Sequence, residues 1–219
     1  MYNTIIFDVD GTLLDTRPGI ISAVKSVIDK NKLKQLSNEE LNLFVGRSPI
    51  QEAFHYFCGT DEFMSQRCAE EYRFKYKQGD IFNATVYHGI FKLLDLLNHN
   101  KYKLGIATYK RQDNIKQLSE KFGFNKYFDS ICGADNDNKL TKSDIILKCL
   151  KRLGSDISTT IMIGDSCHDA EAANKLKIAF IGVTYGFGFK NELDLIKYKP
   201  LLVAKNVYDI EEFFKKIRR

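Results

Sequence analysis

The stretch that decides the fold is Ile5-Ile6-Phe7-Asp8-Val9-Asp10-Gly11-Thr12-Leu13-Leu14-Asp15, close to the start of the chain. Its first three residues form an apolar run typical of a buried strand, and the run ends in the acids Asp8 and Asp10. Burying a carboxylate there is costly unless its charge is paired or bound to a metal. The stretch therefore predicts a strand with a site at its carboxyl end, which is where open α/β sheets bind ligands.

Short apolar runs alternate with amphipathic segments along most of the 219 residues. This alternation is typical of βαβ units and predicts an α/β protein with a central parallel sheet. Strands are expected at Thr4–Asp8, Lys103–Thr108, Ser130–Gly133, Thr160–Gly164, Ile178–Val183 and Leu201–Ala204. Helices are expected at Ile90–Leu97, Asp113–Phe122, Ser143–Leu153, Asp169–Lys175 and Tyr208–Ile217.

One segment, residues 16–85, interrupts this alternation and shows only helical periodicity, as in Ile20, Val24, Val27 and Ile28. A helical block between the first and second strands is best explained as an insertion. We expect it to form a small α-helical domain over the carboxyl edge of the sheet. Residues 1–15 and 86–219 would then form the core domain.

The composition excludes several classes of function. The chain has 33 Lys and Arg against 28 Asp and Glu, a formal net charge of +5, with no basic block. Nucleic-acid binding requires a clustered basic patch, so it is not expected, whereas anionic small molecules suit this charge. No signal peptide and no apolar run of membrane-spanning length are recognised. Five cysteines without a C-x-x-C spacing favour a reduced, cytoplasmic compartment.

Four further polar residues stand at the end of a predicted strand or near the start of the next helix. These are Thr108, Lys142, Asp165 and Asp169. The carboxyl ends of parallel strands meet at one edge of a sheet, so we expect these side chains to converge with Asp8 and Asp10.

The chemistry of this set fits phosphoryl transfer. Three of the acids, Asp8, Asp165 and Asp169, offer the hard oxygen ligands that Mg²⁺ prefers, and Mg²⁺ bridges carboxylates to substrate phosphate. A hydroxyl and a fixed positive charge, as Thr108 and Lys142 supply, hold phosphoryl oxygens and offset charge in the transition state. Lys139 is the alternative to Lys142 as the phosphate-binding lysine.

The two acids of the first stretch suit different roles. One carboxylate can attack phosphorus and form an aspartyl-phosphate, while a second protonates the leaving oxygen and later activates water. Neighbouring acids resist simultaneous ionisation, so one pKa should be raised. We expect an ionised Asp8 and a transiently protonated Asp10.

This arrangement resembles the haloacid dehalogenase superfamily over the whole chain. Residues 8–15 match the first motif of that family, and Gly164-Asp165-Ser166-x-x-Asp169 matches its fourth. The resemblance implies a Rossmann-like core with an inserted α-helical cap at residues 16–85, Mg²⁺ as the cofactor, a nucleophilic Asp8 and an acid/base Asp10.

The same resemblance implies the metal ligands. Asp8, the backbone carbonyl of Asp10, and Asp165 would bind Mg²⁺, and Asp169 would hold a metal-bound water or the lysine. Val183-Thr184-Tyr185-Gly186-Phe187-Gly188 is similar to a stretch of the phosphoglycolate phosphatases. A Mg²⁺-dependent phosphatase acting on a small phosphate monoester is therefore expected.

Three positions add detail to this expectation. Arg47, in the loop that interrupts the helical block, is a candidate to bind a substrate carboxylate or second phosphate. Ser143 follows Lys142 where many relatives have proline. Tyr109 follows Thr108 where relatives often have asparagine, which would alter the pocket.

Other functions remain open at this stage. A phosphomutase of the β-phosphoglucomutase type, a pyrophosphatase and a nucleotidase share the same acids. A catalytically idle protein that binds a phosphorylated ligand is the alternative from another class. The presence of Asp8, Asp10 and Asp165 favours an enzyme over that alternative.

Overall fold

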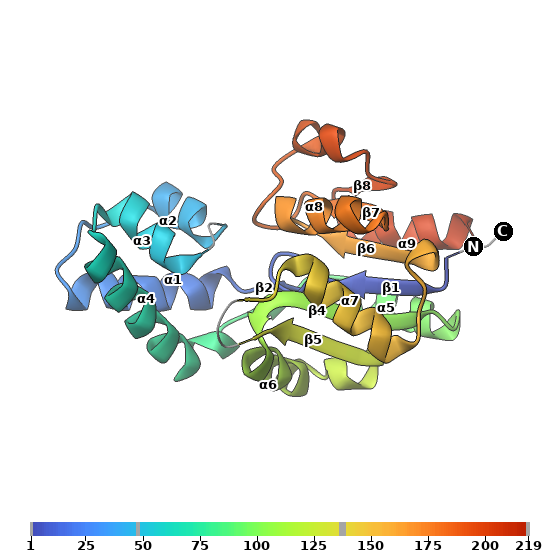
Figure 1. The fold of residues 1–219 in the computed structure, drawn as a ribbon, viewed down its shortest axis with the longest axis horizontal. Helices are drawn as coiled ribbons and strands as arrows, with labels where there is room; N and C mark the ends of the chain where they lie inside the picture. Colours follow the sequence, from blue (N-terminus) through green and yellow to red (C-terminus); the bar gives the residue numbers. More distant parts are fainter. Residues whose placement is uncertain (1, 47–48, 136–138, 218–219) are drawn as a thin grey trace. The chain divides into compact units, whose positions relative to one another are not determined.

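The computed structural model describes residues 2–46, 49–135 and 139–217, and the chain divides into two compact units (Figure 1). The core unit consists of Met1–Asp15 and Val86–Arg219, and the helical unit is Thr16–Thr85.

A six-stranded sheet with strand order β5-β4-β1-β6-β7-β8 forms the centre of the core unit. Its strands are β1 (Thr4–Phe7), β4 (Lys103–Arg111), β5 (Ser130–Ala134), β6 (Thr160–Gly164), β7 (Ala179–Val183) and β8 (Leu202–Ala204). Every neighbouring pair is parallel. The predicted α/β fold with a central parallel sheet is confirmed. All four residues of β1 are buried, because this strand lies between β4 and β6 and is covered on both faces.

Helices flank this sheet. They are α5 (Ile90–His99), α6 (Gln112–Phe122), α7 (Lys142–Leu153), α8 (Cys167–Leu176) and α9 (Val207–Lys216), with short 3₁₀ turns η2 (Phe124–Lys126), η3 (Ile157–Thr159) and η4 (Glu192–Tyr198). The direction of the crossovers reverses after β5, so right-handed connections place α7 and α8 on the face opposite α5 and α6 (Figure 1). Ile146 of α7 and Ala173 of α8 pack into one cluster with Ile6 and Met162 of the sheet.

The helical unit contains α1 (Arg17–Lys30), α2 (Asn38–Val45), α3 (Ile50–Cys58), α4 (Glu62–Lys77) and the 3₁₀ turn η1 (Asp80–Phe82). Its core includes Phe44, whose ring lies 5.0 Å from that of Phe54 and 5.7 Å from that of Phe57. Ser37 begins α2 with a capping box to Glu40, which satisfies amide groups at the start of the helix. Two short strands, β2 (Leu14–Asp15) and β3 (Thr85–Val86), pair where the chain leaves the core unit and returns.

The predicted end of the second long strand was wrong. The strand β4 continues to Arg111 rather than ending at Thr108, and its register with β5 shifts between Ala107 and Arg111. Because β4 still pairs with β5 after the register shift, the strand extends past its apolar residues, and the hydrophobic pattern did not mark the end of β4. The other core strands and helices begin and end within about two residues of the expected positions.

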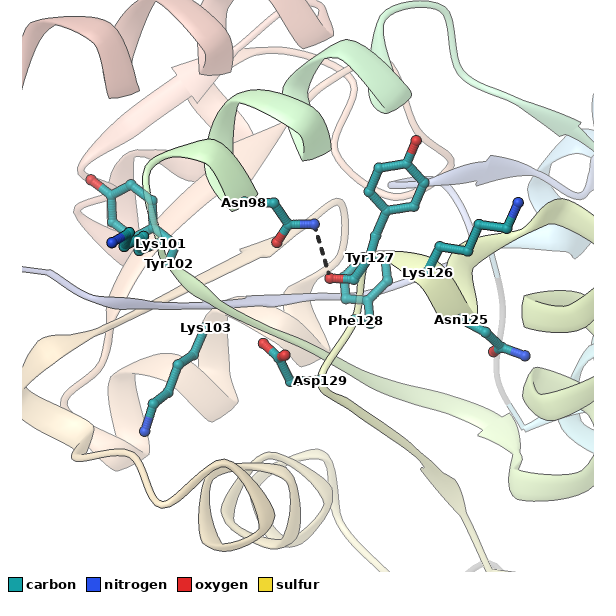
Figure 2. Close-up of a pocket in the computed structure, with 9 residues that line it drawn as sticks. All are labelled: Asn98, Lys101, Tyr102, Lys103, Asn125, Lys126, Tyr127, Phe128 and Asp129. Carbon is teal, nitrogen blue, oxygen red and sulfur yellow. Dashed lines mark hydrogen bonds between the residues drawn. The ribbon is translucent and has the colours of Figure 1, made fainter.

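A polar pocket lies at the amino ends of β4 and β5, the edge of the sheet opposite to the carboxyl ends (Figure 2). It is lined by Asn98, Lys101, Tyr102, Lys103, Asn125, Lys126, Tyr127, Phe128 and Asp129. The Asn98 side-chain amide donates to the carbonyl of Tyr127 at 3.3 Å, and the Asp129 carboxylate accepts from the amide of Leu104 at 2.9 Å. These groups bond to the protein itself, so we assign them a structural role.

Within the three described ranges, no helix is both long enough and apolar enough to cross a membrane.

Candidate active site

The loop that follows β1 places Asp8 at the carboxyl edge of the sheet. The amide of Asp8 still donates to the carbonyl of Ile163 at 2.9 Å, which extends the pairing with β6 by one residue. The chain then turns, and the amide of Gly11 donates to the carbonyl of Leu14 at 2.9 Å. Gly11 has a φ of +76°, and a β-carbon there would overlap the Asp165 carboxylate. Glycine at this position therefore lets the loop pack directly against the site.

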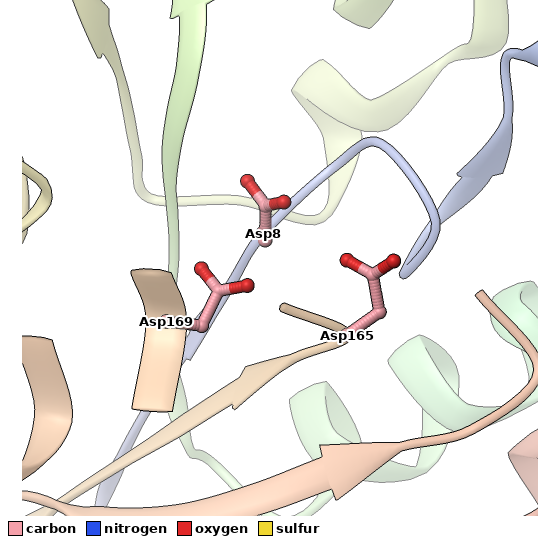
Figure 3. Close-up of side chains that lie close together, drawn as sticks. All are labelled: Asp8, Asp165 and Asp169. Atoms are coloured by element: carbon pink, nitrogen blue, oxygen red, sulfur yellow. The ribbon is translucent and has the colours of Figure 1, made fainter. Parts of the chain in front are cut away.

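Three buried carboxylates meet beside this loop. Asp8 follows β1, Asp165 follows β6 and Asp169 lies in the first turn of α8 (Figure 3). Each offers an oxygen, and these oxygens lie within 4.8 Å of one another. This is a set of hard oxygen donors with excess negative charge, which fits a Mg²⁺ ion.

Lys142 lies between two of these acids. Its Nζ is 2.7 Å from Asp8 Oδ1 and 2.7 Å from Asp169 Oδ1, with the side chain only 4% exposed. Lys142 is the first residue of α7, and the preceding Thr141 caps this helix by accepting from the amide of Asp144. Burial alone would lower the pKa of Lys142, but the carboxylates of Asp169 and Asp8 raise it, so the ammonium is retained.

The carboxylates respond to burial in the opposite way. Burial raises the pKa of Asp8, although the Lys142 ammonium and a hydrogen bond from Thr108 act against the rise. Burial also raises the pKa of Asp165 to about 8, and the nearby charges of Asp169 and Asp8 add to the rise. Burial opposes ionisation of Asp8, whereas the Lys142 ammonium 2.7 Å away favours it. A divalent cation among these oxygens would favour the ionised forms.

Thr108 and Asp10 complete the set of residues that the sequence predicted for this edge. Thr108 is buried near the end of β4, and its hydroxyl hydrogen-bonds the Asp8 carboxylate. Asp10 lies on the turn after β1 and is more open, with a side chain 28% exposed. Its Oδ2 lies 3.1 Å from Nζ of Lys110.

Three features of this edge were missed from the sequence. Lys110 pairs with Asp10, and no sequence signal indicated this pair, because the strand was expected to end at Thr108. The Tyr109 hydroxyl accepts from the amide of Lys142 at 2.9 Å, and its ring centre lies 5.7 Å from the Lys142 ammonium. Tyr109, noted from the sequence only as a departure from the family pattern, thus contacts both the amide and the ammonium of Lys142.

The third missed feature is a loop after β7 that holds Asp165. The amides of Phe187 and Gly188 donate to Asp165 Oδ2 at 2.7 and 3.1 Å. A β-carbon at Gly186 would lie 2.4 Å from the carbonyl oxygen of Gly11, so only glycine allows this close approach. The stretch of residues 183–188 was noted for its resemblance to phosphoglycolate phosphatases. Its hydrogen bonds to Asp165 could not be predicted, because backbone amides are the same in nearly every residue type.

The outcome differs for the two other residues that the sequence suggested for phosphate or substrate binding. Lys139, the alternative to Lys142, is exposed, and its amide donates to the Asp135 carboxylate at 2.9 Å. Arg47 lies outside the described residues.

Comparison with known proteins bears on this arrangement. A sequence model of a family described as haloacid dehalogenase-like hydrolase matches residues 5–183. A 5'-nucleotidase of Pseudomonas aeruginosa is 32% identical over 88% of this chain and 87% of its own length. A pyrophosphatase, PpaX of Bacillus pumilus, is 30% identical over 95% of this chain and 94% of its own. A phosphoglycolate phosphatase of Agrobacterium fabrum is 29% identical over 90% of this chain and 86% of its own length.

Among solved structures, a haloacid dehalogenase-like family hydrolase of Streptococcus pneumoniae superposes with a TM-score of 0.89 at 26% identity. The match covers 97% of this chain and 98% of that one. The resemblance drawn from the sequence motifs is therefore confirmed.

Proposed function

This chain belongs to the haloacid dehalogenase-like hydrolases, and from that premise we propose that it is a Mg²⁺-dependent phosphatase acting on a small phosphate monoester. The observation that carries the proposal is the buried cluster in which Lys142 bridges Asp8 and Asp169 beside Asp165. Keeping three acids and an ammonium out of water costs free energy of folding, so their convergence calls for a function.

In this proposal Asp8 is the nucleophile. A carboxylate oxygen of Asp8 attacks phosphorus, the bond from phosphorus to the leaving oxygen breaks, and an aspartyl-phosphate forms. The Lys142 ammonium and the Thr108 hydroxyl, which already touch the Asp8 carboxylate, bind the phosphoryl oxygens as they approach.

Asp10 is proposed as the acid and base. It gives its proton to the leaving oxygen in the first step, and in the second it accepts a proton from the water that hydrolyses the aspartyl-phosphate. Its partial exposure suits this role, because the leaving group and the attacking water both need access to it.

The metal site is assigned to Asp8, Asp165 and the backbone carbonyl of Asp10. When bound, Mg²⁺ would offset negative charge on the phosphoryl oxygens and favour the ionised form of Asp8. Asp169 was expected to hold a metal-bound water or the lysine, and its contact with Lys142 supports the lysine. Its Oδ2 already accepts from the Ser166 hydroxyl at 2.6 Å and from the Ser166 amide at 3.2 Å, so this side chain is held in place.

We propose that the two units have different functions. Residues 1–15 and 86–219 would be the catalytic domain, and residues 16–85 the cap that selects the substrate, with Arg47 as a substrate-binding residue. The five cysteines are free, which supports a cytoplasmic location.

Phosphoglycolate is the first substrate to test, and its support is the similarity to a phosphoglycolate phosphatase. The relatives named 5'-nucleotidase and pyrophosphatase are of comparable similarity, so nucleoside monophosphates and pyrophosphate belong in the same panel.

The experiment measures phosphate release from p-nitrophenyl phosphate, 2-phosphoglycolate, sugar phosphates, nucleoside monophosphates and pyrophosphate. Each assay is run with Mg²⁺, with a chelator and with the variant Asp8→Asn. We expect Mg²⁺-dependent release that falls by about a thousandfold or more in Asp8→Asn, because the nucleophile is removed.

A matched control is Asp29→Asn, which removes an exposed carboxylate of the helical unit. It should leave the p-nitrophenyl phosphate rate unchanged. A folded, Mg²⁺-loaded protein that releases phosphate from no member of the panel would contradict the proposal and favour a phosphomutase or an idle binder.

A further inference from the structure

The proposed reaction uses Lys142 and leaves a second buried ammonium of the site unexplained. The Lys110 side chain is 6% exposed, nearly as buried as Lys142, and its Nζ lies 3.1 Å from Asp10 Oδ2. Lysine rarely occupies so buried a position unless it is paired with an acid. Here the acid is the one that the mechanism assigns to proton transfer.

The backbone explains how Lys110 reaches that acid. Lys110 is two positions after Thr108, so on a regular strand both side chains would lie on the same side. The register of β4 with β5 shifts in this stretch, and the Lys110 amide donates to Thr108 Oγ1 at 3.2 Å. Irregularities of this kind re-aim side chains beside active sites. The Lys110 backbone also packs closely against β5, because a β-carbon at Gly133 would lie 2.5 Å from the carbonyl oxygen of Lys110.

We propose that Lys110 is a positioning residue that holds the Asp10 carboxyl group against the leaving oxygen of the substrate. The inference rests on the proposed function and deepens it. An aspartate on a partly exposed turn has several side-chain rotamers, and an ion pair to a buried, backbone-anchored lysine selects one of them. Misplacing a reacting group by about 1 Å can cost on the order of a hundredfold in rate.

The step that Lys110 supports is the first one. The bond from Asp8 to phosphorus forms while the bond from phosphorus to the leaving oxygen breaks, and the proton of the Asp10 carboxyl moves to that oxygen. Asp10 is left as a carboxylate facing the Lys110 ammonium. The contact is a hydrogen bond to a neutral carboxyl before the proton transfer and an ion pair after it, so the interaction favours the transition state over the bound substrate.

This role predicts a dependence on the leaving group. Phenyl phosphate and p-nitrophenyl phosphate are similar in shape, but phenolate is far more basic than p-nitrophenolate and needs the proton much more. The value of kcat/KM covers only the steps through formation of the aspartyl-phosphate, so it isolates the acid role of Asp10 from its later base role.

The experiment compares kcat/KM for both esters in the wild type, Lys110→Met, Asp10→Asn and the double variant. We expect Lys110→Met to lose about tenfold or more with phenyl phosphate and about twofold or less with p-nitrophenyl phosphate. Asp10→Asn should show the same pattern with a larger loss, about a hundredfold or more with phenyl phosphate. Adding Lys110→Met to Asp10→Asn should cause no further loss, because the group that Lys110 positions is gone.

Lys116→Met is the matched control, since it removes an exposed lysine of the neighbouring helix α6. Lys110→Arg is the conservative variant, and it should recover part of the phenyl phosphate rate because the charge is kept. Thermal melting confirms that each variant is folded, and the ratio of the two esters is independent of the fraction that is active.

Equal losses with both esters, accompanied by a raised KM, would overturn the inference and make Lys110 a ligand of the transferring phosphoryl group. No loss with either ester would overturn it as well. Both results leave the phosphatase itself intact, whereas a wild type that releases no phosphate overturns the proposed function and this inference with it.

Discussion

The edge of the sheet that carries the proposed active site has two regions that differ in how their charges are buried. The floor, defined as Asp8, Lys142, Asp165 and Asp169, is almost completely buried. The rim, defined as Asp10, Tyr109 and Lys110, is partly open at Asp10 and Tyr109, which are 28% and 39% exposed, while the Lys110 side chain beside them is 6% exposed.

Charges in the floor must balance one another, because water cannot compensate for a lost partner. Charges at the rim are partly screened by solvent, so each pair there adds less to the free energy of folding. A floor substitution should therefore change stability and activity together, whereas a rim substitution should change the reaction and leave the fold intact.

The largest effect is expected from Lys142→Met. Removing this ammonium leaves Asp8 and Asp169 buried without their shared cation, which should lower the free energy of unfolding by about 3–5 kcal/mol without Mg²⁺. Phosphate release should fall by about a hundredfold or more, because the phosphoryl oxygens lose a charged partner. Urea denaturation with and without Mg²⁺, together with the p-nitrophenyl phosphate assay, measures both quantities.

The control is Lys139→Met, an exposed lysine three residues earlier. It should change the free energy of unfolding by no more than about 0.5 kcal/mol. If Lys139→Met abolishes activity and Lys142→Met does not, the assignment of the phosphate-binding lysine is reversed.

An intermediate effect is expected from pH in the absence of metal. The pKa of Asp165 rises from 3.8 to about 8 on folding, so between these values the folded protein holds a proton that the unfolded chain has released. The unfolded state then binds fewer protons, and stability falls as pH increases. The melting temperature in chelator should therefore drop by several degrees between pH 6 and pH 8.5.

Mg²⁺ should reverse the dependence of the melting temperature on pH. The ion binds ionised carboxylates, so the rise in melting temperature on adding Mg²⁺ should be larger at pH 8 than at pH 6. Asp165→Asn is the control and should flatten both the pH slope and the Mg²⁺ response. A wild type that melts at the same temperature across this range with and without Mg²⁺ contradicts the assignment of the floor as a metal site.

The smallest effect is expected at the rim from Tyr109→Phe. The substitution removes the hydroxyl that accepts from the amide of Lys142 and keeps the ring beside the Lys142 ammonium. Losing one such hydrogen bond should lower the free energy of unfolding by about 1 kcal/mol and kcat by no more than about fivefold.

Tyr109→Asn removes the ring as well and tests the other contact. Because it also removes the cation–π contact, we expect a larger loss of kcat than in Tyr109→Phe, at unchanged Mg²⁺ dependence. Equal kcat values for both variants would show that the ring contributes nothing to the position of Lys142.

Much of the fold followed from hydrophobic pattern. The run Ile5–Phe7 is buried on both faces in the structure, and such runs alternate with helices in the order that a parallel sheet requires. The end of β4 did not follow from pattern, because a shifted register with β5 carries polar residues into the strand. The residues of the floor could be predicted from the sequence because each of them stands at a strand end or in the first turn of a helix.

The contacts of the rim could be predicted less well from the sequence, for a physical reason. Lys110 has the same sequence context as any lysine on a polar strand end, and only the irregular backbone of β4 brings it to Asp10. Tyr109 was visible as a departure from the family pattern, but its contact with the amide of Lys142 joins residues 33 positions apart.

The sequence by itself determined which chemical groups this protein has and that most of them stand near a strand end or in the first turn of a helix, because apolar runs and helical periodicity are local patterns. Only the tertiary structure decided which groups pair: Lys142 with Asp8 and Asp169, Lys110 with Asp10, and the amides of Phe187 and Gly188 with Asp165. Such pairs depend on distances of about 3 Å between segments that are remote along the chain, and on backbone donors that every residue type shares.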